Sequence, residues 1–310
     1  MKNLEKIKGD ASFRQFFRKK NKNFNSIIVF AKKEKIKNLL IYDAINKILN
    51  KNRILAPELY QEDYKKNYIE IQDFGNDTIY KILKKKKNKR FFYFEKIIKI
   101  LNKIQAIKNR KIKNFKKKTY AIPEYKREIL LQEANLFSEW YVTKNKKKFK
   151  EKFKKIIKRL VSHLKLRNNV FVHRDFHVSN LMLHNDKLGV IDNQDALIGN
   201  KAYDLASLID DVRFKTSRSF KNHVYKMYIN KQKTLNKDNF KNDFEILSIL
   251  RNLKIIGIFT RLSKRDGKKN YLKLIPYAWK LINLRINDNE IFIDLKDLLK
   301  KNFKEKINEN

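Results

Sequence analysis

Two apolar runs of the chain each lead directly into polar residues whose types and spacing could do chemistry. The first run, VFV, is followed by the sequence HRDFHVSN at residues 173–180. The second run, LGVI, is followed by Asp192. Four residues separate Asp175 from Asn180, and the second aspartate comes only after another strand-like segment.

This spacing is what the transfer of a phosphoryl group to an alcohol requires. Asp175 would accept the proton of the attacking hydroxyl and hold that hydroxyl in line with the γ-phosphorus. Asn180 and Asp192 would offer hard oxygen ligands to Mg²⁺, which bridges the phosphates and neutralises developing charge. The protein itself would contribute mainly position and electrostatic stabilisation.

Each of these residues also has a structural interpretation when it is taken singly. An aspartate before a helix is commonly an N-cap, and an asparagine in a turn is commonly a turn former. We interpret His173 as a structural hydrogen-bonding residue of the loop, and His177 and His184 as surface or structural residues rather than a metal set. Only the full combination between two apolar strands indicates a kinase.

The elements that must position these residues can be read from the hydrophobic pattern. Residues 26–30 and 68–72 read as strands, and apolar residues recur at helical spacing over residues 39–48. The turn signal DFGN at residues 73–76 is the predicted joint between two lobes. We therefore predict an N-terminal nucleotide-binding lobe at residues 1–75.

The rest of the chain, residues 76–310, is predicted to be a larger helical lobe that carries the catalytic loop and the substrate pocket. Apolar stripes at residues 97–107 and 129–140 favour helices, and basic runs at residues 84–89 and 144–150 favour exposed loops or helix ends. Short strands are expected to return only near residues 170–172 and 188–191. The predicted fold class is α+β, a bilobal protein-kinase-like fold with a small, mostly β N-lobe.

The composition restricts the partners and the location. The 310 residues carry a formal net charge of +42, but lysines are spread along the whole chain, which is typical of solvated surface charge. Nucleic acid is therefore not the expected partner. The absence of cysteine excludes disulfides and thiolate chemistry, and no apolar run approaches the ~20 residues of a membrane span. We expect a cytoplasmic monomer with no membrane partner.

At the catalytic residues the sequence resembles the aminoglycoside phosphotransferase and choline kinase superfamily. Further segments are similar to its N-acetylmuramate/N-acetylglucosamine anomeric kinases. They are GDASFRQFFR at residues 9–18, EANLFSEWY at 133–141, VIDNQDA at 190–196, YDLASL at 203–208, RNLKIIGIFTRL at 251–262 and RDGK at 265–268. The similarity runs along nearly the whole chain.

The resemblance implies a kinase that uses ATP and Mg²⁺ to phosphorylate the anomeric hydroxyl of an amino sugar in cell-wall sugar recycling. It implies that Asp204 is a buried brace of the catalytic loop, and that Glu133, Asp211 and Arg261 lie near the sugar. Residues 9–18 would form a phosphate-binding hairpin, with nucleotide contacts expected from Ser12, Phe13, Arg14 and Arg18. For Arg251, Arg261 and Arg265, a solvated helix face and a contact to the lactyl carboxylate of muramate remain equal alternatives.

The sequence departs from the pattern of this family at two places. Asn193 follows the metal-binding aspartate where the family generally has an aromatic residue, and we expect a polar side chain there to loosen the metal site. No lysine lies in the strand-like run at residues 27–30, so Arg14 and Arg18 are the expected substitutes for a phosphate-binding lysine.

Two other functions remain as alternatives. A kinase of the same fold could act on an aminoglycoside or a choline-like alcohol, although a strongly basic chain disfavours cationic substrates. A basic nucleic-acid-binding protein could have arisen from a kinase that lost activity, but Asp175, Asn180 and Asp192 are all retained.

Overall fold

The computed structural model describes residues 4–7, 14–20, 24–287 and 289–307, and the chain forms two compact units. Unit 1 comprises Met1–Pro123 and Val170–Leu197, and unit 2 comprises Glu124–Asn169 and Ile198–Asn310. The chain passes from one unit to the other after Pro123, within β8 (Asn168–Val172) and within β11 (Leu197–Asn200). Unit 1 thus contains the predicted nucleotide-binding lobe together with the predicted catalytic segment. The lobe boundary at residues 75 and 76 stays a prediction.

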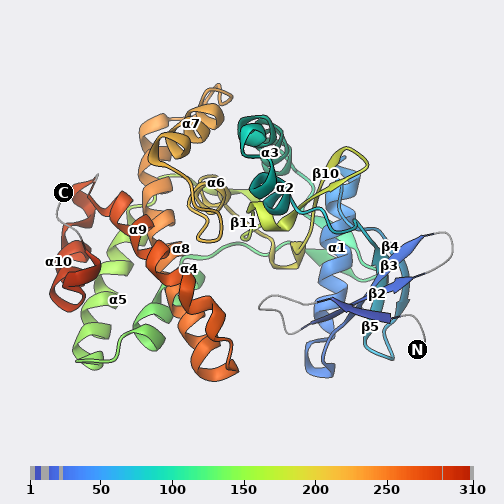
Figure 1. The fold of residues 1–310 in the computed structure, drawn as a ribbon, viewed down its shortest axis with the longest axis horizontal. Helices are drawn as coiled ribbons and strands as arrows, with labels where there is room; N and C mark the ends of the chain where they lie inside the picture. The colour runs from blue at the N-terminus through green and yellow to red at the C-terminus, as the bar shows by residue number, and fades with distance from the viewer. Residues whose placement is uncertain (1–3, 8–13, 21–23, 288, 308–310) are drawn as a thin grey trace. The chain divides into compact units, whose positions relative to one another are not determined.

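Unit 1 is built on a five-stranded antiparallel sheet in the order β1-β2-β3-β5-β4 (Figure 1). The strands are β1 (Leu4–Ile7), β2 (Gln15–Lys20), β3 (Asn25–Phe30), β4 (Leu59–Asp63) and β5 (Tyr68–Gln72). The two predicted strands at residues 26–30 and 68–72 are β3 and β5, which pair with each other at the centre of the sheet. Their apolar side chains therefore form much of the local core.

The predicted first helix is α1 (Lys37–Lys51), which covers this sheet. Its apolar side chains recur every three or four residues and pack against β3 and β5, because this spacing places them on one face of a helix. The shared core contains Ile27, Val29, Leu39, Tyr42, Ile69 and Ile71. Unit 1 continues with α2 (Ile79–Lys85), α3 (Arg90–Gln105), β6 (Lys111–Lys113), β7 (Thr119–Ala121), β9 (Leu181–His184) and β10 (Lys187–Val190).

Unit 2 is helical in the part of the chain that the structure describes, apart from its ends of β8 and β11. Its helices are α4 (Arg127–Leu136), α5 (Lys146–Ser162), α6 (Tyr203–Ile209), α7 (Arg218–Ile229), α8 (Lys237–Asp266), α9 (Ile275–Ile286) and α10 (Ile293–Asn302). Gly257 lets α8 approach α4 closely, since a Cβ there would collide with the backbone of Leu136 and Phe137. At this point α4 gives way to the π-helical turn Phe137–Tyr141.

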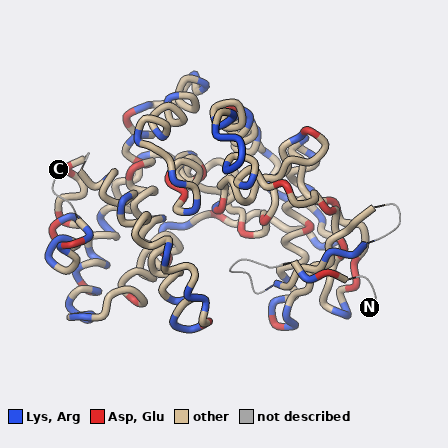
Figure 2. The backbone as a smooth tube through the Cα atoms, in the orientation of Figure 1, with Lys and Arg blue, Asp and Glu red and all other residues tan. Residues whose placement is uncertain are grey.

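The α+β prediction is confirmed, but the expected number of strands after residue 76 is too low. The strands predicted near residues 170–172 and 188–191 are β8 and β10, whereas β6, β7, β9 and β11 have only three or four residues each. Such short segments give no clear alternation in the sequence. Figure 2 shows lysine and arginine along both units rather than on one element, and no helix among the described residues is long and apolar enough to cross a membrane.

Candidate active site

The predicted catalytic loop follows β8 and folds back on itself through backbone hydrogen bonds. The N–H of His177 donates to the carbonyl of Asp175 at 3.1 Å, and the N–H of Asn180 donates to the carbonyl of His177 at 2.9 Å. Arg174 has a φ of 75°, which turns the chain sharply before the predicted base. The Asp175 side chain is half-buried at this bend.

A tight hairpin brings Asp192 next to Asn180. Asn185 and Asp186 both have positive φ values, as a two-residue turn between β9 and β10 requires. The hairpin register pairs Val190 with Leu181, and the N–H of Ile191 then donates to the carbonyl of Asn180 at 3.0 Å. Asn180 directly precedes β9 and Asp192 follows β10 by two residues, so both predicted metal ligands lie at the same end of the paired strands.

The Asn180 side chain connects this hairpin to the predicted base. Its Nδ2 donates to the carbonyl of Asp175 at 3.0 Å. The loop that contains Asp175 and Asn180 is therefore hydrogen-bonded within itself and to Ile191, the residue before Asp192. The structure therefore brings the three residues with the predicted catalytic roles together. All three lie in unit 1.

The oxygen atoms of Asn180 and Asp192 fit a magnesium ion. Among the described residues no group of three His, Cys, Asp or Glu side chains could hold a metal. Magnesium does not require such a group, because it is usually bound by one or two protein oxygens together with substrate phosphates and water. The Asp192 side chain is 39% exposed, so a metal–phosphate complex could reach it.

Arg14, which immediately precedes β2, is the basic residue in contact with Asp192. Its Nη2 lies 2.7 Å from Oδ1 of Asp192, while its guanidinium stacks over the rings of Phe16 and Tyr42 at 5.5 and 5.7 Å. Burial raises the pKa of Tyr42 to about 12, although the nearby Arg14 opposes this shift. The phenol is thus neutral at ordinary pH.

Arg18 makes several contacts within unit 1. Its Nε and Nη2 donate to the two carboxylate oxygens of Asp73 at 2.5 and 3.1 Å, and its Nη1 donates to Asn76 at 2.9 Å. The hydrogen bond to Asp73 raises the pKa of the Arg18 guanidinium. Arg18 therefore holds β2 to the predicted interlobe joint, and its phosphate contact stays a prediction. Ser12 and Phe13 lie outside the described residues.

Asn193, which directly follows the predicted metal ligand Asp192, is held by hydrogen bonds within unit 1. Its side chain is fully buried, and both amide atoms are used: Oδ1 lies 2.8 Å from Nε2 of His173, and Nδ2 donates to Asn46 at 2.9 Å and to Val190 at 3.0 Å. The hydrogen bonds thus accommodate a polar side chain at this position, and its effect on the metal site stays a prediction. The structural role expected for His173 agrees with these contacts.

The expected sugar-site residues lie in unit 2, along α8 and its neighbours. Glu133 of α4 forms an ion pair with Lys254 of α8 at 2.9 Å and accepts a hydrogen bond from the Tyr125 hydroxyl. Asp211 is buried and accepts from the N–H of Arg213 at 3.0 Å. Asp204 is fully buried within α6.

Several polar atoms in this part of unit 2 are buried without a hydrogen-bond partner among the described residues. Among them are Oδ2 of Asp211, Nη1 of Arg251 and Nε of Arg261. The solvated-face alternative is therefore wrong for Arg251, which is only 4% exposed. It fits Arg265, which is exposed and pairs with Asp266 at 2.8 Å.

The sequence reasoning missed a buried charge cluster around Asp210 in unit 2. Arg285 and Lys221 contact its carboxylate at 2.9 and 3.3 Å, and the hydroxyl of Ser248 donates to it at 2.6 Å. Burial alone would raise the pKa of Asp210, but the Arg285 and Lys221 charges outweigh burial and lower it to about 2. No spacing in the sequence connects these four positions.

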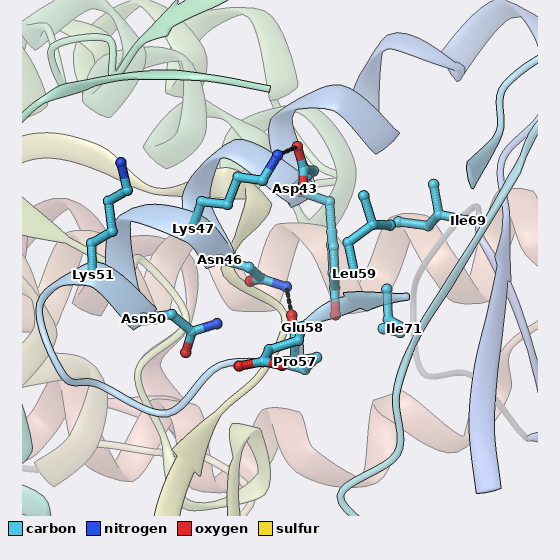
Figure 3. Close-up of a pocket in the computed structure, with 11 residues that line it drawn as sticks. Asp43, Asn46, Lys47, Asn50, Lys51, Pro57, Glu58, Leu59, Ile69 and Ile71 are labelled. Carbon is cyan, nitrogen blue, oxygen red and sulfur yellow. Dashed lines mark hydrogen bonds and ion pairs between the residues drawn. The ribbon is translucent and has the colours of Figure 1, made fainter. Parts of the chain in front are cut away.

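A cavity of about 420 Å³ lies in unit 1 between α1 and the strands β4 and β5 (Figure 3). Tyr42, Leu59, Ile69 and Ile71 form its apolar wall, and Asn46 points across it towards Pro57. No sequence pattern indicated this cavity, because its walls come from α1, β4 and β5, which are separate segments of the chain.

The architecture of the whole chain is that of small-molecule kinases. It aligns with a choline kinase from Streptococcus pneumoniae over 90% of this chain and 92% of that one, with a TM-score of 0.64 at 16% identity. It aligns with the aminoglycoside phosphotransferase APH(4)-Ia over 91% and 93% of the two chains, with a TM-score of 0.63 at 11% identity. At these identities the likeness establishes the fold.

The chain belongs to the phosphotransferase enzyme family, whose model matches residues 3–234. It is 31% identical to an N-acetylmuramate/N-acetylglucosamine kinase of Neisseria meningitidis over 86% of this chain and 80% of the relative. A kinase of the same description from Pseudomonas aeruginosa is 25% identical over 94% of this chain and 86% of the relative. The family and these relatives confirm that the protein is a small-molecule kinase, as the motifs predicted.

Proposed function

We propose that this kinase transfers the γ-phosphoryl group of ATP to the anomeric hydroxyl of N-acetylmuramate or N-acetylglucosamine, forming the α-1-phosphate. The observation that carries the phosphotransfer chemistry is that Asn180 donates a hydrogen bond to the Asp175 carbonyl and accepts one from Ile191, the residue before Asp192. The choice of sugar is supported by the names of the relatives in Neisseria and Pseudomonas.

In this proposal each residue of the connected loops has one role. Asp175 accepts the proton of the sugar hydroxyl, which is the step that makes the oxygen a better nucleophile. Asn180 and Asp192 hold Mg²⁺, which when bound neutralises charge on the phosphates. Arg14, already in contact with Asp192, is the guanidinium that meets a phosphate oxygen in this proposal.

The unpaired polar atoms of unit 2 support a polar substrate. Buried donors and acceptors without partners are costly, so they commonly mark a place where a ligand completes the hydrogen bonds. Arg251 and Arg261 supply donors, which suit a carboxylate or an amide carbonyl, and Asp211 supplies an acceptor for a sugar hydroxyl. We propose that these three residues and Glu133 bind the sugar.

The charge of the chain also favours an uncharged or anionic substrate over a cationic one. The formal net charge is +42, and a cationic aminoglycoside or choline would be repelled by it. We propose salvage of cell-wall sugars in the cytoplasm as the physiological setting, with the protein acting as a monomer.

The test is a panel of acceptors incubated with the purified protein and Mg-ATP. The panel contains both N-acetyl sugars, their unacetylated forms, an aminoglycoside and choline, and phosphorus NMR follows the products. Turnover confined to N-acetyl sugars, with an anomeric phosphate signal, would support the proposal. Turnover of choline or the aminoglycoside alone would refute the substrate assignment and keep the phosphotransfer chemistry.

A further inference from the structure

A continuous series of side-chain hydrogen bonds runs through unit 1 from α1 to the predicted catalytic base. The backbone N–H of Asp175 donates to Nδ1 of His173 at 3.2 Å, and Nε2 of His173 lies 2.8 Å from Oδ1 of Asn193. Nδ2 of Asn193 donates to Oδ1 of Asn46 at 2.9 Å, and Nδ2 of Asn46 donates to the carbonyl of Pro57 at 2.9 Å.

The two ends of this series fix the direction of every hydrogen bond in it. The Pro57 carbonyl can only accept, so the Asn46 amide must present its NH₂ group to Pro57 and its oxygen to Asn193. At the other end a backbone N–H can only donate, so Nδ1 of His173 is the acceptor. His173 is therefore the neutral tautomer with its proton on Nε2.

Burial makes this arrangement costly to break. His173 and Asn193 are fully buried, and Asn46 is 4% exposed, so water cannot replace a lost partner without rearrangement. Hydrogen bonds aligned in one direction also polarise one another in a region of low dielectric constant. Substitution of one of these three residues should therefore also weaken the hydrogen bonds between the remaining ones.

The series also includes both chain neighbours of the predicted metal ligand Asp192. Asn193 directly follows it, and Nε2 of His173 lies 3.1 Å from the carbonyl of Ile191, which directly precedes it. Ile191 and Asn193 are thus both hydrogen-bonded to His173, which also accepts from the backbone N–H of Asp175.

We propose that Asn46 and Asn193 are positioning residues, through which α1 holds the catalytic loop and the metal-binding loop in their mutual geometry. This inference rests on the catalytic roles of Asp175 and Asp192 in the proposed function. It does not depend on which alcohol is phosphorylated. Asn46 is the informative position, because among its described hydrogen bonds, which also include one with Tyr42, only the bond to Asn193 reaches either loop.

Asn50 provides a matched control on the same helix. It lies one turn from Asn46, lines the same cavity, and exchanges two hydrogen bonds of 2.9 Å with the backbone of Ala56. Asn50→Leu removes the side-chain hydrogen bonds to Ala56, which is the neighbour of Pro57, but it keeps the hydrogen bond between Asn46 and Asn193.

The experiment compares Asn46→Leu, Asn193→Leu and Asn50→Leu with the unchanged protein. We expect the first two to lower kcat by about 10- to 100-fold and to raise the Mg²⁺ concentration that half-saturates ATP binding, with the acceptor KM unchanged. Asn50→Leu should keep both values within about twofold. In nitrogen-15 NMR, the Nε2–H signal of His173 should shift in the first two variants only.

The readouts separate this inference from the choice of substrate. If the unchanged protein phosphorylates no N-acetyl sugar, the substrate proposal fails, while Mg²⁺-dependent ATP binding and the His173 signal still test the positioning residues. Asn46→Ala replaces Asn46→Leu if the latter does not fold. The inference is overturned if the Asn46 variant matches Asn50→Leu in both ATP binding and the His173 signal.

Discussion

Nη2 of Arg14 lies 2.7 Å from Oδ1 of Asp192, and this ion pair connects the residue before β2 to the segment that follows β10. The Arg14 side chain is 3% exposed, whereas the Asp192 side chain is 39% exposed. The carboxylate is thus neutralised from its buried side and open on its solvent side. This asymmetry suits a residue that must also hold a metal ion.

Asp192→Ala should weaken ATP binding in the presence of Mg²⁺ and lower kcat/KM by at least about 100-fold, because metal coordination supplies several kcal/mol of charge stabilisation. Titration with ATP at fixed Mg²⁺ and initial-rate kinetics measure the two effects. Asp195→Ala is the control, since the Asp195 carboxylate is exposed and accepts a hydrogen bond from Gln194. Equal losses in both variants would contradict the metal role of Asp192.

Asp175→Asn should lower kcat by about 100- to 10,000-fold while ATP affinity remains close to that of the unchanged protein, because only the proton acceptor is removed. The hydrogen bonds that use the backbone of Asp175 are kept in this variant. Rapid-quench kinetics and nucleotide titration distinguish the two quantities. Unchanged turnover would show that another group accepts the proton.

Asp210→Asn should destabilise unit 2 by about 3–5 kcal/mol, because it leaves Lys221 and Arg285 buried beside a neutral group. Urea unfolding monitored by circular dichroism measures the difference. Asp266→Asn is the control, because its ion pair with Arg265 is exposed and should contribute little. Similar losses in the two variants would contradict the importance of burial at Asp210.

The stability of the unchanged protein should decrease in acid partly through the same residue. The pKa of Asp210 is about 2 in the folded protein against an ordinary value of 3.8, so the unfolded chain takes up the proton more readily. The contribution of Asp210 is therefore complete above about pH 4 and is lost as the pH falls to about 2, a change of about 2 kcal/mol. Urea unfolding at several pH values should show a smaller acid dependence in Asp210→Asn.

Gly257→Ala should destabilise the protein by about 1–3 kcal/mol, although alanine is the better helix former, because the new Cβ would collide with the Leu136 backbone. Thermal unfolding measures the change. Gly267→Ala is a useful comparison, since its Cβ would meet open space and only its φ of +67° is unfavourable. A neutral or stabilising Gly257→Ala would show that α8 and α4 can separate without cost.

The sequence was sufficient for those features that depend on neighbouring residues. The spacing of Asp175, Asn180 and Asp192 indicated a kinase because their separations reflect a single loop and a single hairpin. The two central strands and α1 were predictable for a similar reason, since their apolar residues repeat with the period of a strand or a helix.

Only the tertiary structure decided which distant residues share a buried environment. Asn46 and Asn193 are 147 positions apart, and Asp210 and Arg285 are 75 positions apart, so no local periodicity relates them. Asn193 was expected to loosen the metal site because it stands where the family generally has an aromatic residue, and its hydrogen-bond partners could not be read from the sequence. Its contacts follow from packing, because a buried polar group is stable only when the fold brings it partners from elsewhere in the chain.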